Sequence, residues 1–387
     1  MLKRPINFSV FKFYIKHFFE FILKHFYYKK KNIKDFLFSI YNMMQYVLLL
    51  TFVATVLSQS NLRGNSDLSA VVGDQVFEWK EFSNFQERFS KKYSTLQEME
   101  ERFAVFIENF RAIRQHNSDL SQNFTMGINQ FTDLTHAEFK ATYVSGLKAA
   151  PLQATGCKSF SSSASGAPET VDWRLHNAVT PVKDQGQCGS CWTFSASGAM
   201  EGAWSISKGS LVSLSEQELV DCAGLKYGSM GCNGGQMDGA FKYAIDNGMC
   251  TEAAYPYTSG VTKTAGTCHS CSAVDTFSSC SDVKANDQLS LKAAVAQQPV
   301  SIAIEADTAY FQSYSSGVLT SSACGTSLDH GVLVVGYGAE NGQKYWLVKN
   351  SWSTSWGDQG YVKIARSDST NDKGVCGIAM QPSFPSV

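Results

Sequence analysis

The chain has 387 residues, which is enough for more than one domain. Its formal net charge is only −1, but residues 167–387 carry 13 basic and 20 acidic side chains, a local net charge of −7. An acidic C-terminal part argues against nucleic-acid binding.

Residues 1–42 differ in composition from the rest of the chain. They are rich in Phe, Lys, Ile, Tyr and Asn, the amino acids of AT-rich codons. We interpret them as a spurious N-terminal extension, with synthesis beginning at Met43 or Met44. The alternative is a basic, aromatic extension that associates with a membrane.

The next segment is a short apolar run from Tyr46 to Leu57. It is too short to span a bilayer comfortably. Ser58, with Val56 two positions earlier, makes a plausible signal-peptidase site. Residues 43–58 are therefore predicted to be a secretory signal peptide, which implies an oxidising compartment.

A long helix is predicted in the region 59–166. Six residues follow one another at spacings of 4, 4, 3, 4 and 4, which keeps them near one stripe of a helix. Thr95 lies three residues before the first of them, as in a capping box. The six are Glu98, Arg102, Phe106, Asn109, Ile113 and Asn117.

Two further features complete this region. The motif Gly127-x-Asn129-x-Phe131-x-Asp133 follows the helix, and a serine-rich segment runs from Ser159 to Ser165. Such a serine-rich segment is expected to be a flexible, accessible linker.

Residues 167–387 read as an α+β fold of two lobes. Helices are predicted at Cys191 to Gly202, after Ser215 with Glu218 as capping partner, and at Met237 to Asp246 before Gly248. Strands are predicted at Val300 to Ile304, Val332 to Val335 and Lys344 to Val348, with a hairpin turn at Asn341-Gly342. The cleft between a helical lobe and a β-barrel-like lobe is the expected active site.

The most informative segment is Gln185-Gly-Gln-Cys-Gly-Ser-Cys-Trp192. Cys191 precedes a predicted helix, whose dipole favours a thiolate. A thiolate nucleophile needs a base and an orienting partner. His330 follows 139 residues later, and Asn350 a further 20 residues on.

The pair Cys188 and Cys191 has other interpretations. It could be a thioredoxin-like redox pair, or half of a zinc site with Cys268 and Cys271. The 77 positions from Cys191 to Cys268 are far more than compact zinc sites use, and neither interpretation explains His330.

From about Val76 onward the chain resembles the papain and cathepsin L group of cysteine proteases. The resemblance rests on the motifs above and on several others in the same order. These are Val171-Asp172-Trp173-Arg174, Gly231-Cys232-Asn233-Gly234-Gly235, Tyr255-Pro256-Tyr257, Gly336-Tyr337-Gly338, Lys349-Asn350-Ser351-Trp352 and Trp356-Gly357. It implies an inhibitory propeptide over 59–166, a mature peptidase over 167–387, and the papain-like two-lobe fold.

The resemblance also implies roles for the site residues. Cys191 is the nucleophile, His330 its ion-pair partner and general acid/base, and Asn350 the residue that orients the imidazole. Trp352 shields that hydrogen bond, and Gln185 contributes to the oxyanion hole. One departure stands out, because Ser353 and Ser355 replace two glycines of the family pattern.

Substrate binding is implied by a further set. Gly234 and Gly235 would bind the substrate backbone. The main specificity pocket would be lined by Met237, Ala303, Leu328 and Gly331, with Gln381 at its far end. These apolar lining residues predict a preference for Leu, Val or Phe one position before the cleaved bond.

Cysteine pairing is only partly implied. By resemblance Cys188 pairs with Cys232, Cys324 with Cys376, and Cys222 with Cys268 or Cys271. Without Cys191, nine cysteines remain in the mature part, an odd number, and Cys157 would make the count even. A Cys157-tethered peptide would make the enzyme an aminopeptidase resembling cathepsin H, whereas otherwise Cys157 is discarded with the propeptide.

The resemblance implies peptide substrates, the chain's own propeptide as an intramolecular inhibitor, and cystatin-type inhibitors. It implies no cofactor and no metal ion, and a monomer that is not bound to a membrane in its mature form. The expected location is the secretory pathway, ending in a lysosome or digestive vacuole or outside the cell. Two alternatives are an inactive homologue and a propeptide-dominated inhibitor of other cathepsins, which would have a damaged Cys191 or His330.

Overall fold

The computed structural model describes residues 65–144, 146–147, 156–320 and 323–387, with side chains from residue 73. The chain divides between Ser83 and Asn84 into two compact units, and each is described by itself. The expected extension 1–42 and signal peptide 43–58 lie outside the described residues. Within the described residues, every helix is either too short or too polar for a membrane span.

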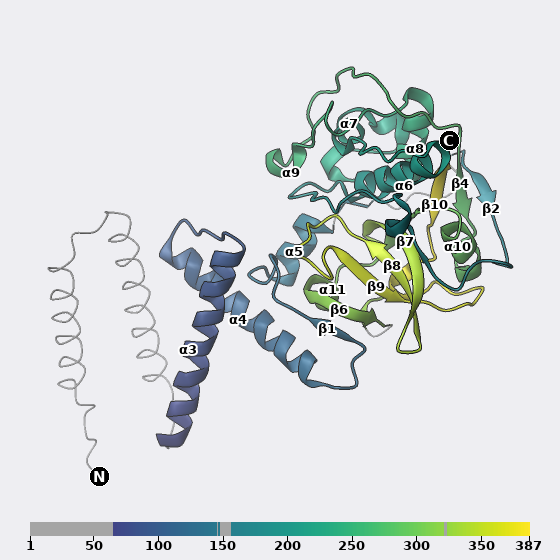
Figure 1. Cartoon of the computed structure of the whole chain (residues 1–387). Coiled ribbons are helices and arrows are strands. Elements are labelled where there is room, and N and C mark those ends of the chain that lie inside the picture. The colour runs from purple at the N-terminus through teal and green to yellow at the C-terminus, as the bar shows by residue number, and fades with distance from the viewer. Residues whose placement is uncertain (1–64, 145, 148–155, 321–322) are drawn as a thin grey trace, which may run out of the picture. The chain divides into compact units, whose positions relative to one another are not determined.

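Residues 84–387 combine helices with one mixed sheet (Figure 1). The helix α3 (Asn65–Arg88) crosses the boundary between the two units. The other helices are α4 (Leu96–Ser118), α5 (His136–Tyr143), α6 (Cys191–Lys208), α7 (Glu216–Cys222), α8 (Met237–Asn247), α9 (Ser259–Thr262), α10 (Gln288–Val295) and α11 (Ala309–Ser313).

Ten strands of the described residues form the sheet, in the order β1-β6-β9-β8-β7-β5-β10-β4-β2, with β3 paired to β7. They are β1 (Phe124–Met126), β2 (Lys158–Phe160), β3 (Val171–Asp172), β4 (Ser279–Val283), β5 (Val300–Ile304), β6 (Tyr314–Leu319), β7 (His330–Glu340), β8 (Gln343–Lys349), β9 (Tyr361–Ala365) and β10 (Ser383–Ser386). Both outer strands, β1 and β2, precede residue 167.

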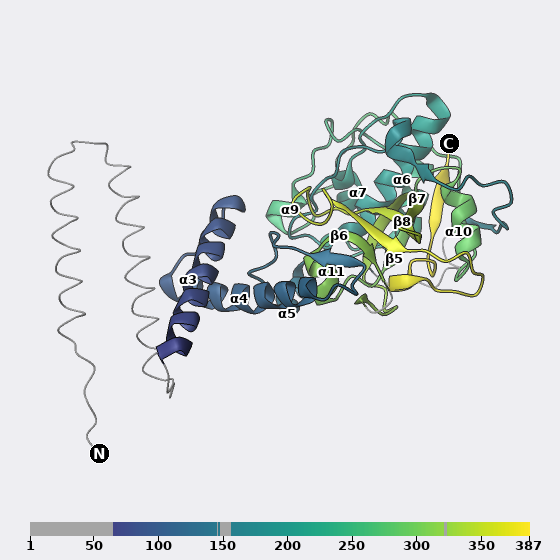
Figure 2. The same cartoon turned by 60° about the horizontal axis from the view of Figure 1, so that its bottom comes forward.

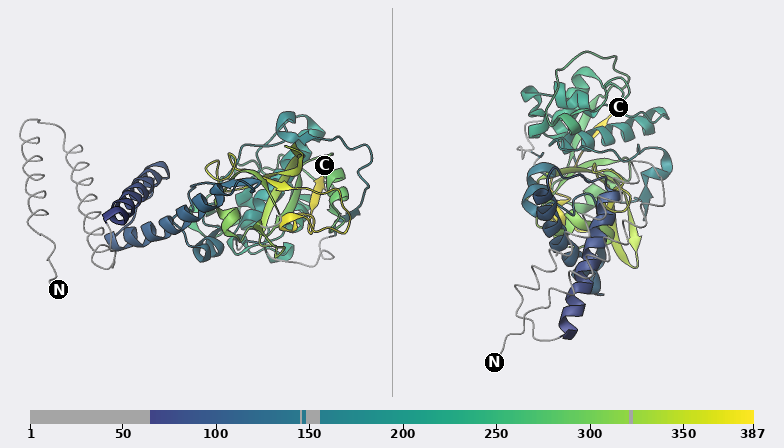
Figure 3. Two further views of the ribbon diagram at one scale, coloured as in Figure 1. Left: turned by 90° about the horizontal axis from the view of Figure 1, so that it is seen from below. Right: turned by 90° about the vertical axis from the view of Figure 1, so that its left-hand side faces the viewer.

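The region 167–387 has the two lobes that the sequence predicts. The helices α6, α7 and α8 gather in one lobe, and β6, β7, β8 and β9 form the other (Figures 1 and 3). The predicted turn Asn341-Gly342 joins β7 to β8, and both residues have the positive φ that such a turn needs, 49° and 80°. The α+β fold class is therefore confirmed.

The stripe of polar residues on α4 holds the chain that follows it. Arg102 forms an ion pair with Glu138 of α5 at 2.7 Å. Asn109 donates through Nδ2 to the backbone oxygens of Thr132 and Leu134, at 2.9 and 3.0 Å. The spacing of these residues is thus explained by the segment 124–138, which their side chains fix along one side of the helix.

The helix α4 also begins where the sequence predicts. Thr95 accepts a hydrogen bond from the backbone N–H of Glu98 at 3.1 Å, and the Glu98 carboxylate accepts one from the N–H of Ser94. In α7 only half of the expected capping box forms. Ser215 caps the N–H of Glu218, but the Glu218 carboxylate accepts bonds from Cys250 N–H and the Tyr243 hydroxyl instead.

The expectation of a flexible linker over Ser159 to Ser165 is wrong for its first residues. Lys158–Phe160 forms the strand β2, which pairs in parallel with β4. Cys157, directly before it, is disulfide-bonded to Cys280 in β4. Serine content alone did not predict the strand β2, because the strand is held by the disulfide of Cys157 and by the contact of Phe160 with Phe384.

Candidate active site

The first residue of α6 is Cys191, so the predicted nucleophile lies at the N-terminal end of that helix. The side chain is fully buried. Its Sγ accepts a hydrogen bond from the backbone N–H of Gly331 at 3.3 Å, which brings the start of β7 against the start of α6. Cys191 is also the one cysteine of the chain that forms no disulfide.

His330 begins β7, on the lobe opposite α6. Its Nε2 lies 2.8 Å from Oδ1 of Asn350, which directly follows β8. The Trp352 indole stacks on the imidazole, with ring centroids 4.6 Å apart. Both residues of this hydrogen bond are buried, so the imidazole ring is fixed in place. The other ring nitrogen, Nδ1, has no hydrogen-bond partner among the described residues.

Burial disfavours a charge on both Cys191 and His330 in this form of the protein. Burial raises the pKa of the Cys191 thiol to about 12. Burial also lowers the pKa of His330 to about 4, although the hydrogen bond that His330 donates to Asn350 Oδ1 acts in the opposite direction. Burial therefore opposes the thiolate that the helix dipole favours, so the expected thiolate stays a prediction.

The depressed pKa of His330 makes a pH-dependent contribution to stability. At His330 the unfolded chain binds a proton below pH 6.5, whereas the folded chain binds it only below about pH 4. The free energy of unfolding therefore decreases by on the order of 3 kcal/mol as the pH is lowered from 6.5 to about 4. We expect Cys191→Ala chains to lose less stability over this range when His330 is also changed to Asn. Urea unfolding at pH 7, 5.5 and 4 measures the difference, and equal slopes would contradict it.

Gln185 is engaged on both ends of its amide. Its Oε1 accepts a hydrogen bond from the Ser351 hydroxyl at 2.7 Å. Its Nε2 donates to the backbone oxygens of Cys188 at 3.1 Å and Tyr143 at 3.4 Å. Tyr143 ends α5, so a carbonyl from the region before residue 167 occupies the donor that is expected to bind an oxyanion.

The cleft is occupied by the chain itself. Gly235 donates its N–H to the backbone oxygen of Gly146 at 3.1 Å, and Leu147 forms a parallel bridge with Gly235. A Cβ added to Gly235 would lie 2.6 Å from the Trp192 ring and from the Ser229 hydroxyl, so the packing against these two side chains requires glycine. Gly234 has φ 105°, a conformation that also requires glycine.

The residues of the expected specificity pocket lie close together. Met237, Ala303 and Leu147 belong to one buried apolar cluster, and Leu328 packs against it. The Met237 sulfur would be 3.3 Å from a Cβ on Gly331. The neutral Gln381 side chain donates to Gln236 at 2.8 Å.

Several residues before position 167 cover the site, and this role was not predicted for any of them. Phe131 and Phe139 contact the Trp352 indole edge-on, at 5.4 and 5.3 Å between ring centroids. Gln130 donates through Nε2 to the Trp352 backbone oxygen at 2.7 Å. Gln130 and Phe131 lie within the second motif before residue 167, which is the only local signal that could have pointed to them.

The two serines that replace family glycines behave differently. Ser353 has φ 62°, so it holds the strained conformation for which glycine is better suited. Ser355 instead donates its hydroxyl to Oε1 of Gln130 at 2.8 Å. This departure from the family pattern adds a contact between the regions before and after residue 167.

Replacing Ser355 by glycine is expected to weaken this contact. The loss of one partly buried hydrogen bond, about 1 kcal/mol, should speed acid-induced conversion of the full chain roughly fivefold. Conversion can be followed by gel densitometry over time. Ser353→Gly is the matched control, because it relieves strain without removing a bond to Gln130. Equal rates for the two variants would contradict the role of Ser355.

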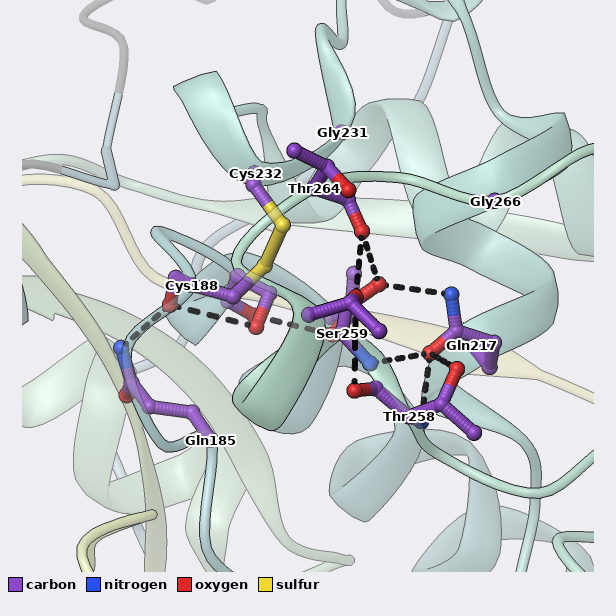
Figure 4. Close-up of a disulfide and its surroundings, with 12 residues drawn as sticks. Gln185, Cys188, Gln217, Gly231, Cys232, Thr258, Ser259, Thr264 and Gly266 are labelled. Carbon is purple, nitrogen blue, oxygen red and sulfur yellow. Dashed lines mark hydrogen bonds between the residues drawn. A yellow bond between two sulfur atoms is a disulfide. The ribbon is translucent and has the colours of Figure 1, made fainter.

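All eleven cysteines lie in the described residues. The structure pairs Cys188 with Cys232, Cys324 with Cys376 and Cys222 with Cys268, and it adds Cys250–Cys271 and Cys157–Cys280. Figure 4 shows Cys188–Cys232, with Gln185 directed at the Cys188 carbonyl. Two clusters have ligand-type side chains, Glu218–Cys250–Cys271 and Cys157–Asp238–Asp282, but their cysteines are disulfide-bonded and offer no thiolate to a metal.

The geometry of fold and site agrees with comparison to known proteins. Residues 167–386 match the papain family of cysteine proteases, and residues 82–139 match the cathepsin propeptide inhibitor domain. The chain belongs to the papain family of cysteine proteases and carries the inhibitory propeptide of a zymogen. Below, "proregion" denotes residues 59–166 and "peptidase domain" residues 167–387.

Individual proteins of known name or structure are similar to most of this chain. The chain is 46% identical to the probable cysteine protease RD21C of Arabidopsis thaliana, over 76% of this chain and 65% of that protein. It is 44% identical to the senescence-specific cysteine protease SAG39 of Oryza sativa subsp. indica, over 77% and 87%. Among solved structures, it is similar to the recombinant stem bromelain precursor and to digestive procathepsin L 3 of Tenebrio molitor larval midgut. Both have a TM-score of 0.73, at 38% and 40% identity, covering 80% of this chain and 99% of theirs.

Proposed function

We propose that the protein is a cysteine endopeptidase made as an inactive zymogen, with Cys191 as nucleophile and His330 as general acid/base. The observation that carries this proposal is the arrangement of Cys191 at the helix start, His330 on the opposite lobe, and Asn350 holding the imidazole at 2.8 Å. Both reactive groups are present, which argues against the inactive-homologue and inhibitor-only interpretations.

Once the cleft is open to water, the burial that disfavours a charge on Cys191 and His330 is relieved. The Cys191 proton then passes to His330, and the thiolate attacks the carbonyl carbon of the scissile bond. The Gln185 amide and the Cys191 N–H stabilise the oxyanion. His330 returns the proton to the leaving amine, and a water molecule then hydrolyses the thioester to release the acid product.

The proregion inhibits the enzyme by occupying the sites that a substrate needs. Gly146 and Leu147 cover Gly235, and Tyr143 occupies the Gln185 donor. Leu147 pairs with Gly235 in the parallel sense, whereas by family resemblance a substrate runs in the opposite direction to the propeptide. The proregion thus uses substrate contacts while its chain runs backwards through the cleft.

Substrate preference follows from the apolar lining and the neutral Gln381. We expect N-terminally blocked peptides with Leu, Val or Phe one position before the cleaved bond to exceed the arginine peptide in kcat/KM by about tenfold or more, because a buried arginine finds no carboxylate there. A fluorogenic series measures this. The variant Gln381→Glu should raise arginine cleavage selectively, and equal cleavage of arginine by the unaltered enzyme would contradict the pocket assignment.

The aminopeptidase alternative receives no support. Cys157 is tethered to Cys280, but the residues it holds, 158–160, pair with β4, whereas the backbone at Gly235 is contacted by residues 146–147. Cleavage of N-terminally blocked peptides distinguishes the two activities, because an aminopeptidase requires a free amino terminus.

Location and partners follow from the same features. Five disulfides suit an oxidising compartment of the secretory pathway, with a lysosome, a digestive vacuole or the extracellular space as its end point. Peptide substrates and cystatin-type inhibitors would use the same cleft. We expect the mature enzyme to be a monomer.

A further inference from the structure

The disulfide Cys157–Cys280 joins two parts of the chain that activation is expected to separate. Cys157 lies after the inhibitor domain, which ends at residue 139, and before the peptidase match, which begins at residue 167. Cys280 lies in β4, inside the peptidase domain. The bond therefore crosses the boundary at which the mature enzyme is expected to begin.

The residues after Cys157 are also built into the peptidase domain without the disulfide. In β2, Lys158 pairs with Ser281 and Phe160 with Val283. The Phe160 ring meets Phe384 of β10 edge-on at 5.3 Å. This strand therefore adds main-chain hydrogen bonds and apolar contact to an edge of the sheet, as peptides do in β-augmentation.

The serines that follow continue the attachment. Ser162 donates its N–H to the Ser290 hydroxyl at 3.1 Å, and that hydroxyl donates to the Ser162 carbonyl oxygen at 3.1 Å. Ser290 lies in α10, a helix of the peptidase domain, and its side chain is buried. Residues 157–162 thus behave as part of the peptidase domain.

Only ten positions separate Cys157 from Leu147, the residue that blocks the cleft. A cut in the serine-rich segment would break the chain after Cys157. The inhibitory segment would then still be attached to the peptidase domain through Cys157–Cys280. A tethered inhibitor has an effective concentration in the millimolar range and is not lost on dilution.

We propose that residues 157–166 remain with the active enzyme as a disulfide-held edge strand, and that the cut which releases the inhibitory segment lies before Cys157. A cut in the serine-rich segment alone leaves the cleft blocked. The step itself is peptide-bond hydrolysis with water and requires no redox partner. This proposal rests on the proposed zymogen function.

Mass spectrometry of the acid-activated full-length protein tests the proposal. Without reductant, the active enzyme should retain Cys157, either at the start of its main chain or in a short peptide released by reduction. An active enzyme that lacks Cys157 under non-reducing conditions would overturn the proposal but leave the protease function intact. Absence of all peptide hydrolysis would instead count against the proposed function.

A second experiment tests whether a cut in the serine-rich segment is enough to release the proregion. A recognition site for an added sequence-specific protease is inserted between the exposed residues Ser165 and Gly166. The protein with unaltered cysteines is compared with the double variant Cys157→Ser and Cys280→Ser. Both proteins are cut without reductant. We expect the proregion of the double variant alone to separate on a non-reducing gel.

The same pair of proteins reports on inhibition. Dilution after cutting should release activity from the double variant at least tenfold more than from the protein with unaltered cysteines. A smaller difference, or separation of the proregion from the protein with unaltered cysteines, would overturn the proposal. Recovery of that activity by reduction is the positive control for the tether.

Discussion

Replacing Cys191 by alanine is expected to lower peptide hydrolysis by at least about 10⁴-fold, because loss of a nucleophile removes the chemical step while leaving binding intact. The other ten cysteines are all disulfide-bonded, so none of them offers a substitute thiol. The measurement is kcat/KM for a blocked fluorogenic peptide after processing of the Cys191→Ala zymogen by an added protease.

A histidine pair provides the matched control. His330→Ala should be nearly as damaging as Cys191→Ala, whereas His176→Ala should leave kcat/KM unchanged because His176 is exposed and its ring meets the Trp173 ring edge-on. Activity that survives in the processed Cys191→Ala protein would end the assignment of the nucleophile.

Replacing Phe139 by alanine is expected to open the zymogen. The Phe139 ring is fully buried and contacts the Trp352 indole beside His330. Truncating such a ring costs about 3–5 kcal/mol, which corresponds to a weakening of proregion binding by about 100-fold or more. We therefore expect the uncut Phe139→Ala chain to hydrolyse a small peptide at neutral pH, where the unaltered zymogen is silent.

The control for this variant is Leu120→Ala in the same proregion, because Leu120 is 97% exposed. A gel run beside the assay shows that the chain is uncut when activity is measured. A folded Phe139→Ala zymogen that remains as inactive as the Leu120→Ala zymogen would show that the aromatic contact on Trp352 does not hold the cleft closed.

Much of the catalytic arrangement could be predicted from local sequence. Cys191 at a helix start and a strand over Val332 to Val335, which the structure extends to His330–Glu340, follow from hydrophobic periodicity and short motifs that act over a few residues. Gly235 was named from the sequence as a residue that binds a peptide backbone, and its N–H donates to the backbone oxygen of Gly146 in the proregion.

The remainder depends on contacts between residues far apart in the chain. Gln130 and Ser355 are 225 positions apart, and neither has a local pattern that names its partner. The partner of Cys157 was likewise not predictable, since cysteine count gives parity and not connectivity. The opposing effect of burial on the Cys191 pKa was not predicted, because burial is a tertiary effect that a helix-dipole argument leaves out.

The position of β1 and β2 at the two edges of the sheet bears on how the protein avoids aggregation. An unpaired strand edge is a template on which another chain can add. Loss of β1 on activation uncovers β6, whose residues Tyr314–Leu319 include no charged side chain to discourage such pairing. A retained β2 would keep the opposite edge closed, so the activated enzyme would be exposed to edge-to-edge association along β6, which is labelled in Figure 2, and protected along β4.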